Sequence, residues 1–224
     1  MISIVVVLGI LIHLLGPFNS KMIVKIMKDK PSVYQRLFRY ITPQRSYDIS
    51  TIIGALICSS VFFQELLSEI SNDQNIYGIL FFCLSGALLP LVIWKIKNRV
   101  VVFNGKHSVN IDSMFFLPLT ALSEELIWRF FLPSLLLINI GDSITLSILI
   151  SSIGFIILHI PLGGFKSIVY MSLFTIFAVL SYLTFGIIAS VAFHISHNLV
   201  IQFFRPLRVK TFNTKAPTLS ETEW

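Results

Sequence analysis

The sequence predicts an all-α fold: a polytopic membrane bundle of about seven transmembrane helices. Hydrophobic residues make up 55% of the chain and charged residues only 12%, which is about half of the charged share in soluble domains. The apolar residues also gather in long blocks, and a helix needs about 20 of them to cross the hydrocarbon core of a bilayer. We therefore expect the lipid bilayer to surround the bundle.

Seven apolar blocks are long enough, or nearly long enough, to span. They lie at residues 2–18, 49–67, 76–94, 113–136, 143–160, 166–183 and 184–204. No basic segment precedes the first block, and no small-residue cleavage site follows it. We therefore expect this block to remain as a helix instead of being removed as a signal peptide.

The charges between the blocks predict the orientation. Basic residues concentrate at 19–48, 95–106 and 205–215, and the net charge is +6. An odd number of spans places all three regions on one side, and the positive-inside rule makes that side the cytoplasm. We predict a cytoplasmic membrane protein with its N-terminus outside, its C-terminus inside and no nucleic-acid partner. The leaning of the composition towards Ile, Phe, Lys and Asn suggests a bacterial source. The stretch 33–41 fits either a short interfacial amphipathic helix or a solvated loop, and the oligomeric state stays open.

The two halves of the chain differ in the polar residues that they place at membrane depth. An ionisable side chain there costs about 2.5–3.5 kcal/mol on insertion scales and usually marks a function. The last four spans contain Glu124, Glu125, Arg129, His159, His194 and His197. We therefore expect a scaffold of about three helices at 1–110, a catalytic core at 111–205 and a cytoplasmic tail at 206–224. His13, alone in the first span, is interpreted as a packing or interface residue.

The stretch SEELIWRFF (123–131) carries both carboxylates. Glu125 and Arg129 are four residues apart and share one helix face, so they can form an ion pair. Glu124 points about 100° away around the helix and is left as the unpaired acid. Because burial makes a carboxylate a stronger base, Glu124 is a candidate general base or acid. The alternative is an ion pair that only locks helix packing.

Two further helices carry polar pairs with the same spacing. Phe155 and His159 share a face of one helix, and His194 and Asn198 share a face of another. Each pair alone is typical of a hydrogen-bonded core residue or of interhelical contact. His197, one step off the face of His194, is interpreted as a polar contact on the helix flank.

Together these side chains can support hydrolysis. Glu124 and His159 can hold and deprotonate a water, while His194 and Asn198 donate hydrogen bonds to a peptide oxyanion. Glu124, His159 and His194 can equally ligate a divalent metal such as zinc, although the sequence lacks HExxH. The residues alone leave open whether there is no cofactor or a metal.

In order and spacing, the motifs EExxxR, FxxxH and HxxxN resemble those of the CPBP family of intramembrane endopeptidases. That family includes CAAX prenyl endopeptidases and bacterial proteins linked to bacteriocin production, self-immunity and peptide-pheromone maturation. The resemblance covers residues 113–204. It implies that Glu124 activates water with His159 as its partner and that His194 and Asn198 form the oxyanion site. The supporting residues are Glu125, Arg129 and Phe155.

The resemblance leaves two questions open. The family is named for metalloproteases, but a metal-free mechanism that depends on glutamate is also argued for it; we favour the metal-free one. Family members often have a small residue after the motif arginine, whereas this chain has Phe130. A large side chain there narrows the cavity or changes helix packing, so the substrate of this chain need not match that of its relatives.

The leading hypothesis is an intramembrane endopeptidase that cleaves a small membrane-associated peptide or a membrane protein, as in bacteriocin-type peptide processing. The alternative is a non-catalytic immunity or regulatory protein of the same family that acts by binding a partner. A transporter is disfavoured because the first half of the chain has few polar residues at membrane depth. We expect the active-site cavity in the inner half of the bilayer, reached from the cytoplasm.

Overall fold

The computed structural model describes residues 2–32, 34, 41–72, 75–103, 111–141 and 143–208. Most of the stretch 33–41 and the tail beyond residue 208 lie outside these ranges, so the expectations for them stay predictions. The helices are α1 (Ile2–Asp29), α3 (Pro43–Ser59), α4 (Phe63–Asn72), α5 (Ile76–Ile96), α6 (Ile111–Glu125), η1 (Leu126–Phe131), α7 (Leu132–Ile140), α8 (Ile144–Gly163), η2 (Phe165–Ser167) and α9 (Ile168–Phe203). The strands are β1 (Arg99–Phe103) and β2 (Phe204–Arg208).

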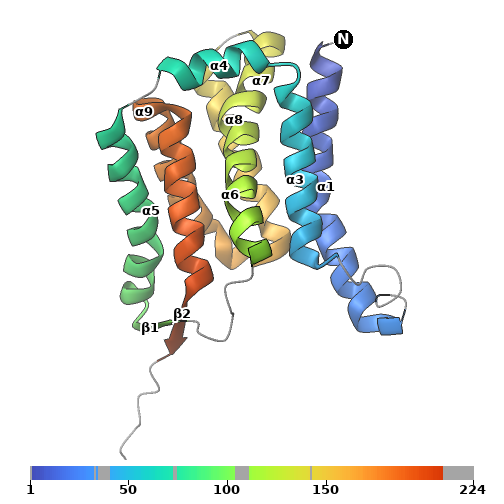
Figure 1. Ribbon diagram of the computed structural model, residues 1–224, viewed down its shortest axis with the longest axis vertical. Helices are drawn as coiled ribbons and strands as arrows, with labels where there is room; N and C mark the ends of the chain where they lie inside the picture. The colour runs from blue at the N-terminus through green and yellow to red at the C-terminus, as the bar shows by residue number, and fades with distance from the viewer. Residues whose placement is uncertain are drawn as a thin grey trace, which may run out of the picture.

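The long helices stand side by side in one bundle (Figure 1). Among the described residues, four helices are long and apolar enough to cross a membrane, and the bent pair α3–α4 makes a fifth span if it counts as one. That number counts α9 once and does not include the continuous run of α6, η1 and α7. The predicted all-α membrane bundle is confirmed, and the chain is a multi-pass membrane protein.

Helix α9 consists of two antiparallel arms, which agrees with the two separate apolar blocks at its position. The helical conformation breaks at Phe185 and at Gly186, whose φ of 74° lies in the left-handed region. The Ser190 hydroxyl lies 3.0 Å from the carbonyl oxygen of Ala178, and this contact brings the two arms together. The second arm therefore returns along the first and carries the HxxxN motif back down the bundle.

The second span differs from its prediction as one helix over 49–67. The helix begins earlier, at Pro43, and ends at Ser59; α4 then continues at 95° to it and lies across one end of the bundle (Figure 1). The composition of α4 explains the bend. Its sequence FQELLSEISN mixes carboxylates with apolar residues on a single short helix, and such amphipathic helices lie at a membrane surface.

Two local features were absent from the sequence-based expectations. The fourth span is interrupted by the π-helical turn η1 directly after the two glutamates, and such turns are frequent at functional sites. The strands β1 and β2 form a two-stranded antiparallel ribbon with Phe103 opposite Phe204. The ribbon joins the lower ends of α5 and α9 in Figure 1. Residues 206–208, expected at the start of the tail, therefore belong to strand β2.

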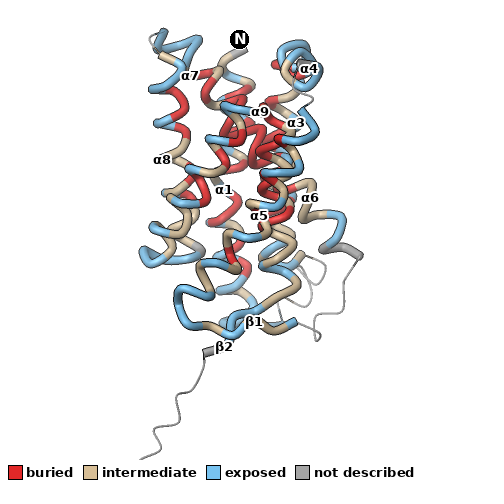
Figure 2. Tube along the Cα trace, turned by 90° about the vertical axis from the view of Figure 1, so that its left-hand side faces the viewer, coloured by how far each residue is buried: buried red, intermediate tan, exposed pale blue. Residues whose placement is uncertain are grey.

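Glycines let neighbouring helices approach closely. A Cβ on Gly54 of α3 would lie 2.5 Å from the carbonyl oxygen of Gly9 in α1. A Cβ on Gly86 of α5 would lie 2.1 Å from the carbonyl oxygen of Phe193 in α9. Small residues at such contacts are typical of membrane helices, which gain little from apolar burial and depend on close packing. Figure 2 shows the buried residues along the bundle axis and the exposed ones outside. Because Gly86 of α5 contacts the backbone of Phe193, helix α5 holds in place the arm of α9 that carries His194.

Candidate active site

Glu125 lies at the centre of a fully buried polar cluster. The Nε atom of Arg129 lies 3.4 Å from its Oε2 atom, so the predicted ion pair is present. Two groups from the second arm of α9 also contact this carboxylate: the Ser190 hydroxyl donates to Oε2, and His194 Nδ1 lies 2.7 Å from Oε1. Glu125 therefore joins the fourth span to α9 and holds His194 in place.

Arg129 is held mainly by charge. Its guanidinium lies 5.0 Å from the centre of the Phe155 ring, a cation–π distance. Its nitrogens have no hydrogen-bond partner within the described part of the chain. The side chain is buried and lines none of the cavities described below. Arg129 thus neutralises Glu125 and packs on Phe155, which agrees with a supporting position for all three residues.

Glu124 has partners of its own. The Tyr47 hydroxyl of α3 donates to its Oε1 atom at 2.6 Å, and His194 Nε2 lies 3.6 Å from its Oε2 atom. A carboxylate can only accept, so His194 donates Nδ1–H to Glu125 and turns its other nitrogen towards Glu124. A carboxylate behind an imidazole fixes the orientation of the ring in the same way in many active sites.

His159 is oriented by its own helix. Its Nδ1 atom lies 2.8 Å from the carbonyl oxygen of Phe155, which can only accept, so Nδ1 carries the proton. The ring packs against that of Phe155, with centroids 4.4 Å apart. Its Nε2 atom is thereby left for a ligand or a water. Glu124 and His194 both lie within electrostatic range of His159.

His197 contacts other polar groups. It is hydrogen-bonded to the Tyr170 hydroxyl, and its Nδ1 lies 3.1 Å from the Asn198 side-chain oxygen. These contacts agree with its interpretation as a polar contact of the helix. They also turn the side-chain oxygen of Asn198 towards His197, which leaves the amide NH₂ of Asn198 to donate elsewhere.

Two cavities meet at this cluster. The first, of about 290 Å³, is lined by Gln44, Tyr47, Asp48, Phe116, Leu117, Thr120, Glu124, Asn198, Ile201 and Gln202. The second, of about 200 Å³, is lined by Phe155, His159, Tyr170, Met171, Phe174, His194, His197, Asn198 and Ile201. Asn198 and Ile201 line both. The structure therefore brings the four predicted catalytic residues around two adjoining spaces, with Glu124 on one side and His159 on the other.

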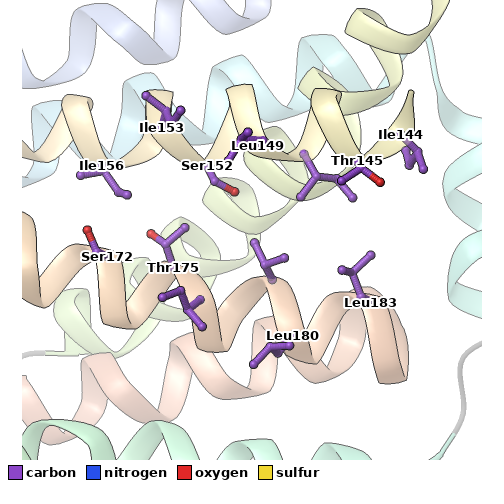
Figure 3. A pocket seen from close by; sticks show the side chains of 13 residues that line it. Ile144, Thr145, Leu149, Ser152, Ile153, Ile156, Ser172, Thr175, Leu180 and Leu183 are labelled. Carbon is purple, nitrogen blue, oxygen red and sulfur yellow. The ribbon is translucent and has the colours of Figure 1, made fainter. Parts of the chain in front are cut away.

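The groove in Figure 3 is larger, about 470 Å³, but has a different chemistry. It runs between α8 and the first arm of α9, and its lining is mostly isoleucine and leucine with a few hydroxyls, such as those of Ser152, Ser172 and Thr175. No carboxylate and no imidazole lines it. It is therefore not a candidate active site.

The side chains do not form a metal site as they stand. Among the described residues, no group of three or more His, Cys, Asp and Glu side chains is placed to hold an ion. The set considered from the sequence, Glu124, His159 and His194, is thus not arranged as a set of ligands.

The site contains residues that sequence reasoning did not select. Tyr47, Asp48 and Gln44 come from α3, in the part interpreted as scaffold, and Tyr47 bonds directly to Glu124. A tyrosine and an aspartate directly before the apolar block 49–67 are a usable signal, although the basic residues of 19–48 indicate a connection. His13, expected to be a packing or interface residue, has two polar contacts: its Nε2 accepts a hydrogen bond from Trp128 Nε1 at 2.9 Å, and its Nδ1 contacts the Thr51 hydroxyl.

Comparison with known proteins supports the identity of this region. Residues 106–200 match the family model described as type II CAAX prenyl endopeptidase Rce1-like. No curated protein and no solved structure matched the chain. The matched segment contains all seven motif residues, from Glu124 to Asn198, and the matched family is a family of proteases. Residues 106–200 are thus similar to the CAAX-protease-like family that the three motifs resemble.

Proposed function

We propose that this protein is an intramembrane endopeptidase that hydrolyses a peptide bond in a small membrane-associated peptide or a membrane protein. The observation that carries the proposal is the position of His194. It contacts the carboxylates of both Glu125 and Glu124, and it adjoins a cavity that Glu124 and Asn198 line together. A base and two oxyanion donors thus lie around two adjoining spaces that share Asn198.

Water is activated by Glu124 in this proposal. The carboxylate takes a proton from a water that His159 helps to hold through its Nε2 atom, and the hydroxide attacks the carbonyl carbon of the scissile bond. Tyr47 keeps Glu124 in one orientation through its hydrogen bond to Oε1. The second carboxylate oxygen, Oε2, remains available to the water.

The tetrahedral oxyanion is stabilised by the second arm of α9. His194 turns Nε2 towards the oxyanion as a donor, while Glu125 holds the ring through Nδ1. Asn198 donates from its amide. Donors that are oriented before the reaction stabilise the developing charge without reorganising. Glu124 then passes its proton to the leaving amine, which completes the hydrolysis.

The organisation of the chain follows from these roles. Residues 111–205 supply the reacting side chains, and 1–110 act as a scaffold that also contributes Tyr47. With the basic connections in the cytoplasm, the cavity of Glu124 opens near the cytoplasmic end, since Gln44 of its lining lies in the first turn of α3 and Gln202 in the last turn of α9. Cysteine accessibility from each side of the membrane tests this orientation.

The direct test compares the wild type with Glu124→Gln in the native host. Glutamine keeps the shape of the side chain and can still accept from Tyr47, but it cannot take a proton from water. Mass spectrometry of small peptides and membrane-protein termini should show a precursor accumulating in the variant while its product disappears. The amount of protein in the membrane is the control for folding.

An unchanged peptide pool in the Glu124→Gln strain contradicts the proposal. An unchanged phenotype in both this strain and a His194→Ala strain would favour the alternative, a non-catalytic immunity or regulatory protein. The two readings therefore separate on the same pair of variants.

A further inference from the structure

The cavity beside Glu124 has an unusual charge balance for a space inside a membrane bundle. Two carboxylates line it, those of Glu124 and Asp48, and both residues are buried, at 5% and 6% exposure. Lysine and arginine are absent from its lining. Arg45 is the nearby cation: it acts on Asp48 electrostatically and lies 5.7 Å from the centre of the Phe116 ring, but it is not among the lining residues. A buried carboxylate is costly unless a positive charge or hydrogen bonds compensate it.

Hydrogen bonds compensate only part of that charge. Asp48 Oδ1 accepts from the Gln44 side-chain amide at 2.8 Å, and Glu124 accepts from Tyr47. The Thr120 hydroxyl, which also lines the cavity, is buried without a hydrogen-bond partner among the described residues. The space therefore presents two buried carboxylates and the Thr120 hydroxyl to whatever enters it.

The rest of the lining suits a peptide. Gln44, Gln202 and Asn198 supply amide groups that can both donate to and accept from a peptide backbone. Phe116, Leu117 and Ile201 supply an apolar wall that can pack against the methylene stem of a long side chain. A volume of about 290 Å³ accommodates one side chain with its adjoining backbone, but not a folded domain.

From these observations, and resting on the proposed function, we propose that this cavity is a subsite for a lysine or arginine side chain of the substrate, next to the scissile bond, with Asp48 as the residue that selects it. The cation binds between Asp48 and the polar groups of Gln44 and Thr120. Glu124, at the inner end of the same cavity, remains free to act on water.

The location of the cavity favours this kind of substrate. Gln44 and Asp48 belong to the first turns of α3, and Gln202 to the last turn of α9, at the end of the bundle where the basic connections lie. Membrane segments carry their own lysines and arginines mainly at the cytoplasmic boundary. A substrate that lies in the bilayer beside the bundle thus brings a basic residue to the level of Asp48.

The experiment uses the full-length protein in lipid nanodiscs with a library of nonapeptides randomised at every position. Mass spectrometry identifies the peptides that are cut and the bond that is broken. Four proteins are compared: wild type, Asp48→Asn, Asp29→Asn and Glu124→Gln. Asparagine keeps the acceptor for Gln44 and removes the charge. Asp29, an exposed aspartate near the end of α1, provides the same charge change outside the cavity.

The expected result is an enrichment of lysine and arginine of about tenfold or more at one fixed position relative to the cut bond, because a hydrogen-bonded charge contributes about 1.5–3 kcal/mol. Asp29→Asn keeps the enrichment, Asp48→Asn loses it while still cutting neutral peptides, and Glu124→Gln cuts nothing. Asp48→Lys should then enrich aspartate and glutamate at the same position.

Three results overturn the inference, and they separate a wrong subsite from a wrong function. If the wild type cuts peptides without a basic preference, or if Asp48→Asn keeps that preference, the subsite is wrong and the peptidase stands. If the wild type cuts no more than Glu124→Gln, the proposed function fails and the subsite fails with it. A thermal melt of Asp48→Asn controls for folding, and Asp48→Glu, which keeps the charge, should keep the preference if the asparagine variant unfolds.

Discussion

The buried ion pair of Glu125 and Arg129 gives a quantitative prediction. The two side chains are fully buried, and their charged groups approach to 3.4 Å, where opposite unit charges attract by about 5 kcal/mol at an effective dielectric constant of about 20. Removal of one partner leaves the other charge buried and uncompensated, which typically costs about 3–5 kcal/mol. Replacement of both partners removes that penalty and can be far less costly than the two single changes together.

We therefore expect Arg129→Met and Glu125→Gln each to lower the free energy of unfolding by about 3–5 kcal/mol. The double variant should lose less than the sum of the two, by a coupling of about 1–3 kcal/mol. The assay is unfolding in mixed micelles by increasing fractions of SDS, followed by circular dichroism. Glu65→Gln on the exposed side of α4 is the control, with an expected change within about 0.5 kcal/mol.

Additive losses in the double variant would refute the reasoning, because they would mean that the two charges do not stabilise one another. If Glu125→Gln loses hydrolysis but the cycle shows no energetic coupling to Arg129, the role of Glu125 is only to orient His194. The cycle thus separates the two contacts that Glu125 makes.

Three other changes test separate contacts. Tyr47→Phe removes the donor to Glu124 and should slow substrate processing about tenfold or more with the protein level in the membrane unchanged; an unchanged rate would contradict a positioning role. Gly186→Ala places a side chain at a φ of 74° and should cost about 1–3 kcal/mol in the same unfolding assay, whereas an unchanged midpoint would mean that the turn of α9 relaxes freely. Trp128→Phe loses the hydrogen bond to His13 and should cost about 1 kcal/mol with processing retained, and a loss of processing at full stability would place this bond in the active site.

Much of the fold follows from patterns that the sequence carries openly. Apolar blocks separated by basic connections predict a membrane bundle because insertion depends on hydropathy and loop charge. The polar faces of the fourth, fifth and seventh spans were visible because Glu125 with Arg129, Phe155 with His159 and His194 with Asn198 each repeat at four residues. The structure indeed places these side chains in one cluster.

The remaining features depend on contacts that no local pattern carries. Tyr47 reaches Glu124 across 77 positions of the chain, and only the packing of α3 against α6 brings them together. The bend between α3 and α4 arises inside one apolar block, and the ribbon of β1 and β2 pairs residues about 100 positions apart. The sequence likewise leaves open whether His194 contacts Glu124 or Glu125. Adjacent residues on a helix face different directions, so the rotation of their helix decides between them.

Incorporation of ¹⁸O from water tests directly whether Glu124 activates water for peptide hydrolysis. The full-length protein in nanodiscs is incubated with the nonapeptide library in water enriched in ¹⁸O, and the new C-termini are weighed. We predict that the wild type produces termini that contain one ¹⁸O atom and that Glu124→Gln, purified at equal yield and stability, produces none. Equal release of labelled termini by both proteins would contradict the claim and would place the base elsewhere in the bundle.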